Sequence, residues 1–342
     1  MNKKNLLFTL DYEIHGNGDG SPYELMVEPT YRLMDLLEKY KQRLIILADV
    51  AEILCFKRYY EETGEDRFFY KDISSQLQNA ISRGHDVQLH IHSSYFKATY
   101  NGVGCEQCWE EYNMAALPYS RIYEMVNMCK SYLEELLKPI KSDYSCVLFR
   151  AANWSMMPTK NIYNALVDNG ITMDTSVYKG GRQSGNVSYD YTGAHSNLHS
   201  YMASEEDINM EDAKGRLCEL PIYTEQRYFW SFVTPIRVFR MIRAKFHRHK
   251  KNPNRTVSVV KGDTSTLSIR SFFKKSPWKL DFNQASGTQM INAVKRIERA
   301  TKGMEGDVNI VLIGHSKTFV KYNEKTLEKF LKFANESVVD GQ

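Results

Sequence analysis

The sequence predicts an α/β fold: a distorted (β/α) barrel of seven strands, with an insertion before the last strand. Short apolar segments alternate with longer segments of helical periodicity up to about residue 177, a pattern typical of parallel strands joined by helical crossovers. Five such repeats within about 180 residues, with further strands to follow, favour a closed barrel over an open sheet. An open doubly wound sheet is the alternative, but no GxGxxG loop follows the first strand, so dinucleotide binding has no support.

The five repeats can be followed in order along the chain. Apolar runs predict strands at 5–13, 43–50, 86–92, 144–150 and 171–177. Helical spacing predicts helices at 31–40, 69–83, 120–137 and 159–169. Gly84 and Gly170 each follow a predicted helix, and Pro139 follows the helix at 120–137, as expected for residues that end helices.

The alternation of strands and helices breaks after Val177. Gly, Ser, Asn and Tyr are frequent in residues 179–203, which predicts a loop. Later elements are expected as a strand at 216–225, a helix at 289–301, a last strand at 308–313 and a closing helix at 324–335. The chain, 1–342, is expected to form one domain with an insertion at about 226–285.

Composition excludes several classes of protein. Hydrophobic residues make up 42% of the 342 residues and charged residues 25%, as in soluble globular proteins. A net charge of +4 without a recognition motif does not favour nucleic acid. The apolar run Leu6–Leu10 is too short for a signal peptide, and no stretch reaches the roughly 18 apolar residues of a membrane span. We therefore expect a cytoplasmic protein, and reduced thiols at the lone Cys105-x-x-Cys108 pair.

Polar residues stand at the ends of five predicted strands, where a purely structural strand would not need them. They are Asp11 and Glu13, His90 and His92, Arg150, Asp174, and His315. The carboxyl ends of barrel strands meet on one face, which is where active sites lie in such barrels. The sequence therefore predicts a site built from these seven residues.

The ordered set resembles the polysaccharide deacetylase (NodB-homology) family, also called carbohydrate esterase family four. The five motifs are TLDYE at 9–13, GHDVQLH at 84–90, FRAANW at 149–154, MDTS at 173–176 and LIGHS at 312–316. Two positions depart from the common pattern: Tyr12 replaces a second aspartate, and Ser94 replaces a second histidine. Glu13 and His92 are the residues nearby in sequence that could take the places of the missing aspartate and the missing histidine.

The resemblance implies a metal-dependent hydrolase that removes an N-acetyl group from a sugar. Asp11 is expected as the general base and His315 as the general acid, because amide hydrolysis needs an activated water and a protonated leaving amine. By the resemblance, Arg150 would hold Asp11, and Asp174 would orient His315 and keep it protonated.

A divalent metal, expected to be zinc, would be bound by Glu13, His90 and His92. Strand residues two apart point to the same side, and a carboxylate with two imidazoles is a known catalytic zinc set. The ligand in doubt is His92, whose alternative is a satisfied hydrogen-bonding role. Trp154 and Tyr95 follow motif strands and are candidates to stack on a sugar ring, with rim packing as the alternative.

The expected substrate is an N-acetylated sugar or glycan precursor of cell-surface polysaccharide, nucleotide- or lipid-linked. A hydrolase of another amide or ester, and a catalytically inactive carbohydrate-binding relative, are the alternatives. The basic segment 237–255 would contact an anionic membrane surface or the phosphates of a carrier, unless it is a solvated helix. Its cations include Arg237, Arg240, Arg243, Arg248, Lys250 and Lys251.

Overall fold

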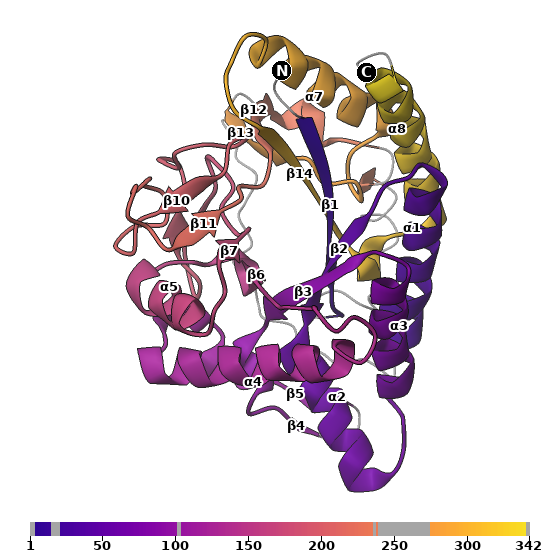
Figure 1. Ribbon diagram of the computed structural model, residues 1–342, viewed down its shortest axis with the longest axis vertical. Helices are drawn as coiled ribbons and strands as arrows, with labels where there is room; N and C mark the ends of the chain where they lie inside the picture. Colours follow the sequence, from indigo (N-terminus) through magenta and orange to yellow (C-terminus); the bar gives the residue numbers. More distant parts are fainter. Residues whose placement is uncertain (1–3, 15–20, 101–103, 235–236, 239–273, 340–342) are drawn as a thin grey trace.

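A computed structural model of the chain describes residues 4–14, 21–100, 104–234, 237–238 and 274–339 (Figure 1). Eight strands form one curled sheet in the order β10-β11-β7-β6-β3-β2-β1-β14. In chain order they are β1 (Lys4–Tyr12), β2 (Leu44–Asp49), β3 (Asp86–Ile91), β6 (Leu148–Ala151), β7 (Met173–Asp174), β10 (Tyr201–Ala203), β11 (Leu217–Glu219) and β14 (Val308–His315). Every neighbouring pair is parallel except β10 and β11.

The sheet closes into a barrel through Ile222. This residue makes one parallel bridge to Tyr178, just beyond β7, and another to Val311 in β14. Since β14 also pairs with β1 along its whole length, the ring of parallel backbone is complete. The predicted distorted barrel is confirmed.

The strand count differs slightly from the predicted seven. The strand expected at 216–225 is divided at Pro221, which has no N–H to continue a ladder, into β11 and a separate strand, β12. The segment 179–203, expected as a loop, contributes β10 to the main sheet. Within the described residues, three two-stranded sheets lie outside the main sheet. They are β4 (Thr99–Tyr100) with β5 (Cys105–Glu106), β8 (Arg182–Gln183) with β9 (Tyr189–Asp190), and β12 (Thr224–Tyr228) with β13 (Lys275–Lys279).

Helices lie around the outside of the strands, with α1 and α8 on one side and α4 across the lower part of the view (Figure 1). They are α1 (Glu28–Lys39), α2 (Val50–Thr63), α3 (Tyr70–Ser82), α4 (Tyr119–Leu137), α5 (Thr159–Asp168), α7 (Gly287–Ala300) and α8 (Lys321–Val339). Short helical turns lie at Tyr23–Val27, Ser93–Tyr95, Trp109–Glu111, Met114–Ala116, Ala152–Trp154, Phe229–Phe232 and Ser316–Thr318. Amphipathic helices of this kind bury one apolar face against the sheet, and the buried residues form one core cluster.

Two predicted regions of the chain are described by the structure only in part. Of the basic segment 237–255, only residues 237 and 238 are described, so residues 239–255 lie outside the described part of the chain. The insertion expected at about 226–285 begins within β12 and ends just beyond β13, and its bounds stay a prediction. Among the helices that the structure describes, none has the length and apolar character needed to cross a membrane.

Candidate active site

The parallel register brings the motif residues to one rim of the barrel. Asp11, near the end of β1, pairs with His315 at the end of β14. His90 in β3 pairs with Arg150 in β6. Because the strands are parallel and in register, four of the seven predicted site residues lie side by side at the carboxyl ends.

Arg150 fixes the position of Asp11. Its side chain is fully buried, and Nη1 donates to Asp11 Oδ1 at 2.7 Å. The other two nitrogens also donate: Nη2 to Thr9 Oγ1 at 2.9 Å and Nε to the Thr175 carbonyl at 2.9 Å. Burial alone would raise the pKa of Asp11, but Arg150, with help from His315, holds that pKa below its ordinary value. Asp11 is therefore an ionised carboxylate at neutral pH, as a proton acceptor must be.

His315 faces the other oxygen of the same carboxylate. Its Nε2 lies 3.4 Å from Asp11 Oδ2. Asn283 holds the backbone of His315 from both sides, accepting from its N–H at 3.1 Å and donating to its carbonyl at 3.0 Å. This close approach depends on Gly314, because an added Cβ there would lie 2.1 Å from a ring carbon of Phe282 and 2.3 Å from Asn283 Oδ1. Burial lowers the pKa of His315, and Asp11 offsets this only in part.

The contacts of the Asp174 carboxylate in the structure are with neighbours other than His315, and its expected orienting role stays a prediction. The buried Asp174 carboxylate accepts instead from the Ser176 hydroxyl at 2.7 Å and from its N–H at 3.2 Å. Ser176 Oγ in turn accepts from the Ala151 N–H at 2.8 Å. A second buried carboxyl, Glu219, interacts with Asp174, and burial raises the pKa of both groups. Asp174 thus ties β7 to the segment that carries Arg150, whereas Asp11 is the carboxylate that reaches His315.

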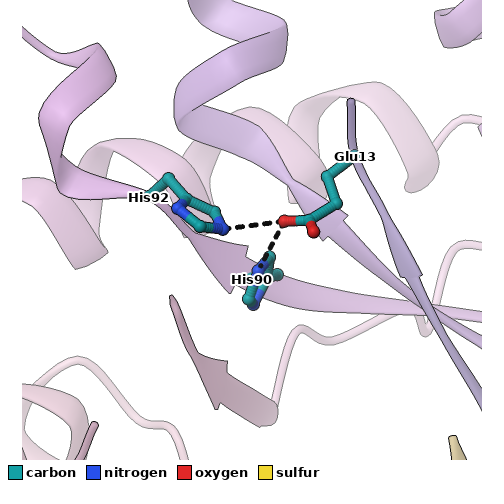
Figure 2. Close-up of side chains that lie close together, drawn as sticks. All are labelled: Glu13, His90 and His92. Carbon is teal, nitrogen blue, oxygen red and sulfur yellow. Dashed lines mark hydrogen bonds and ion pairs between the residues drawn. The ribbon is translucent and has the colours of Figure 1, made fainter. Parts of the chain in front are cut away.

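Glu13, His90 and His92 converge on one point (Figure 2). His90 Nε2 lies 3.2 Å and His92 Nε2 2.7 Å from the same oxygen, Glu13 Oε2. The two histidines reach it together because β3 ends at Ile91, which frees His92 to turn, and their ring planes stand at 79°. One ligand atom from each residue lies within 4.8 Å of the others, and all three side chains are buried.

The donor set fits a divalent cation. His90 Nδ1 donates to the Arg150 carbonyl at 2.8 Å, which turns Nε2 toward Glu13, as in the outer contacts of metal-bound histidines. Burial opposes a charged imidazole, yet the hydrogen bond that His90 donates to Glu13 and the charge of Asp11 raise the pKa of His90 to about 9. The site therefore favours positive charge at this point, either a proton or a cation. Two imidazoles and a carboxylate are ligands that zinc prefers.

Three residues that the sequence analysis missed complete the surroundings of the carboxylates. Lys317 Nζ lies 2.5 Å from Glu13 Oε1. Asp49, the N-cap of α2, accepts from the His92 N–H at 3.0 Å and so fixes the backbone at the end of β3. Glu52 accepts from the Ile14 N–H at 2.9 Å, just beyond Glu13. Lys317 could have been found from its sequence position, because it stands two residues after His315; the other two depend on tertiary contacts.

The two predicted aromatic residues have different environments. Tyr95 is buried, 1% exposed, and its hydroxyl donates to Glu52 at 2.7 Å, so it packs beneath the site and cannot stack on a sugar. Trp154 is partly exposed, and its ring centroid lies 6.1 Å from that of His315. Trp154 and the preceding Asn153 both adopt positive φ, 63° and 54°, values uncommon outside glycine. Trp154 is therefore the aromatic residue at the rim of the site.

No protein-family model and no curated protein matches the sequence. Solved structures that share the fold include the following three. A Parabacteroides distasonis protein assigned as a glycoside hydrolase/deacetylase is 10% identical, with a TM-score of 0.53 over 99% of this chain and 68% of that one. A Pseudomonas aeruginosa protein assigned as a polysaccharide deacetylase is 11% identical, with a TM-score of 0.50 over 97% and 85%. PuuE allantoinase is 10% identical, with a TM-score of 0.50 over 98% and 85%. The chain therefore has the barrel-like α/β fold of the polysaccharide deacetylases.

Proposed function

We propose that the chain is a divergent polysaccharide deacetylase, a metal-dependent hydrolase that removes an N-acetyl group from a sugar or glycan precursor. One observation carries the proposal: the Asp11 carboxylate is held by Arg150 on one oxygen and faces His315 on the other, close to the three converging ligands. Resemblance in five ordered motifs and the shared fold support the same assignment.

Asp11 and His315 divide the proton transfers of the reaction. Asp11, kept ionised by Arg150, takes the proton of the attacking water, and His315 gives a proton to the departing nitrogen. Since Asp11 Oδ2 and His315 Nε2 are 3.4 Å apart, a proton accepted at one group can be passed to the other. Glu13, His90 and His92 would hold the divalent cation, which supplies Lewis acidity to the acyl oxygen and lowers the pKa of water.

Arg150 and Trp154 have supporting roles in this proposal. Arg150 keeps Asp11 in one rotamer and compensates its buried charge. Trp154, whose ring lies beside His315, forms a wall of the substrate site. Reaction on a nucleotide- or lipid-linked precursor in the cytoplasm, within cell-surface polysaccharide biosynthesis, is part of the proposal.

A hydrolase of another amide or ester is the second candidate. The fold shared with PuuE allantoinase and the departures at Tyr12 and Ser94 favour it. The paired Asp11 and His315 speak against an inactive carbohydrate-binding protein, because a site that only binds sugar has no need of two proton-transfer groups 3.4 Å apart.

Acetate release separates these candidates. The purified protein, with its zinc content measured, is incubated with N-acetylglucosamine oligomers, a nucleotide-linked N-acetyl sugar, allantoin and 4-nitrophenyl acetate. The deacetylase proposal expects acetate from at least one N-acetyl sugar. Turnover of allantoin or of the simple ester alone would favour the second candidate, and sugar binding without turnover would favour the inactive relative.

A further inference from the structure

Lys279 places a cation at the same rim, and none of the described carboxylates lies within ion-pair distance of it. It is the last residue of β13, and the backbone that follows joins β14, where the Ile313 N–H donates to the Leu280 carbonyl at 3.0 Å. A bridge between Asp281 and Ile313 continues this contact, two residues before His315. Lys279 is therefore fixed to the strand that carries the proposed general acid.

Two aromatic rings enclose the Lys279 ammonium. Its Nζ lies 4.1 Å from the ring centroid of Trp154 and 4.2 Å from that of Tyr178. Trp154 also contacts the His315 ring, so one indole lies next to both the ammonium and the imidazole. Arg150 lies over the same indole at 5.6 Å. Two cations therefore already contact the face of the Trp154 ring. The group that remains available to bind a ligand is the Lys279 ammonium, more than the indole face.

Among the described residues, no carboxylate lies within ion-pair distance of Lys279 Nζ, and no hydrogen bond satisfies its three donors. The nearby carboxylates are engaged elsewhere. Asp281 accepts from the Asn283 N–H at 2.8 Å and from the Gln284 side chain, and Asp11 is held by Arg150. Burial lowers the pKa of Lys279 to about 8, although the charges of Asp281 and Asp11 act to raise it, so the ammonium still carries its charge at neutral pH. A partly buried cation without a hydrogen-bonding partner is costly unless a ligand supplies one.

A second cation of the same kind lies nearby. Arg237 is partly buried, with its guanidinium 5.2 Å from the Phe232 ring centroid. Burial lowers the pKa of Lys279 and the charge of Arg237 adds a smaller effect in the same direction, whereas Asp281 and Asp11 raise it. Within the described part of the chain, Arg237 has no ion pair either. Thr234 joins its backbone to the turn after Lys279, accepting from the Arg237 N–H at 3.4 Å and donating to the Gln284 carbonyl at 3.0 Å. The Asp281 carboxylate acts favourably on both cations, but burial still lowers the pKa of each, so an additional anion at this place would stabilise both charges.

We propose that Lys279 and Arg237 form an anion-binding subsite beside the Asp11–His315 pair, and that the substrate carries a phosphate or carboxylate group next to the acylated unit. This inference rests on the proposed function, because it assigns the charge of the substrate at that same site. Trp154 and Tyr178 then serve to hold Lys279 in place, and the ammonium and guanidinium donate to the anionic oxygens.

Calorimetric titration with ligands that cannot be hydrolysed tests the subsite. Inorganic pyrophosphate and glucuronate represent the two sources of negative charge, and glucose is the neutral control. The wild-type protein should bind at least one of the anions more tightly than glucose. Lys279→Met and Arg237→Met should each weaken that anion by about tenfold to a hundredfold, the range expected when a charge-assisted hydrogen bond is lost.

Two further variants make the result specific. Lys275→Met removes an exposed cation from the same strand and should leave anion binding unchanged. Lys279→Arg keeps the charge and should retain most of the affinity, which separates loss of charge from loss of folding. Equal weakening in Lys275→Met and Lys279→Met, or no preference for either anion over glucose, would overturn the proposal.

The titration and the turnover assay can fail independently. Acetate release from a neutral N-acetyl sugar without any anion binding would leave the deacetylase proposal standing and remove the subsite. Anion binding that depends on Lys279 and Arg237, without turnover of any acylated compound, would establish the subsite and remove the deacetylase proposal.

Discussion

Lys317 and Glu13 form an ion pair inside the candidate metal site: Lys317 Nζ lies 2.5 Å from Glu13 Oε1, while Glu13 Oε2 faces both imidazoles. Burial would raise the pKa of Glu13, but Lys317 and His92 hold it well below its ordinary value. The carboxylate is therefore ready to bind a cation, yet one of its oxygens already has a positive partner.

Removing this partner should strengthen metal binding. In Lys317→Met the fixed charge that repels a divalent cation is lost, and we expect the zinc dissociation constant to fall by about tenfold or more, given the size of a Coulomb term at this separation. Competition with a chromophoric chelator measures the constant directly. Lys321→Met, an exposed position at the start of α8, is the control and should not change it. Weaker zinc binding in Lys317→Met would mean that the lysine supports the site.

Arg150 should contribute far more to stability than a surface arginine. Arg150→Met leaves the Asp11 carboxylate buried without its cation, and removing one partner of a buried pair costs about 3–5 kcal/mol. Arg216→Met removes an exposed pair, 3.6 Å from Asp168, and should cost about 0–1 kcal/mol. Urea unfolding at neutral pH compares the two. Equally small losses of stability in Arg150→Met and Arg216→Met would show that other groups compensate the charge of Asp11.

Glu219 should make the stability of the protein decrease as pH rises. Burial and the neighbouring Asp174 raise its folded-state pKa well above the unfolded value, so the folded protein binds the proton more tightly. Stability from this group is then full below the unfolded pKa of roughly 4.3 and is lost as pH rises toward the folded pKa. The glutamine in Glu219→Gln does not ionise, so the variant does not lose this stability as pH rises. The stability of the variant relative to wild type should therefore increase between pH 5 and pH 8.

Urea unfolding at the two pH values checks the Glu219 prediction. Glu62→Gln, an exposed position in α2, should show the same difference from wild type at both values. A Glu219→Gln difference that does not change with pH would mean that Glu219 is ionised in the folded protein.

The sequence was most informative where a residue's role follows from its place on a strand. Parallel strands in register bring Asp11, His90, Arg150 and His315 to one rim. The two-residue spacing of His90 and His92 correctly pointed to a common site with Glu13, although His92 reaches it from just beyond the end of β3. The helix α2 was not predicted because it begins directly after β2, with the buried Asp49 as its N-cap and no turn residue between the two elements. The strand expected from residue 144 begins only at Leu148, because the Gln88 side chain accepts from the backbone N–H groups just before and at that position.

Tertiary contacts decided the parts that the sequence did not predict. Asp174 is turned toward Ser176, since β7 is only two residues long and the chain bends directly after it. Tyr95 follows a motif strand, but its short helical turn directs the ring toward Glu52. Lys279 lies about 36 residues before His315 in sequence, and tertiary contacts such as the bridge between Asp281 and Ile313 bring the two close together. Periodicity carries no information on contacts of this range.

The most direct test is the initial rate of acetate release from an N-acetylglucosamine oligomer, or from whichever N-acetyl sugar proves to be the substrate. Zinc-loaded wild type is compared with Asp11→Asn under identical conditions, after circular dichroism has shown that both are folded. General base catalysis contributes roughly 10²–10⁴-fold, so the variant should lose activity by that factor while its zinc content stays the same. Acetate release by Asp11→Asn at the wild-type rate would contradict the assignment of Asp11 as the base and, with it, the proposed site.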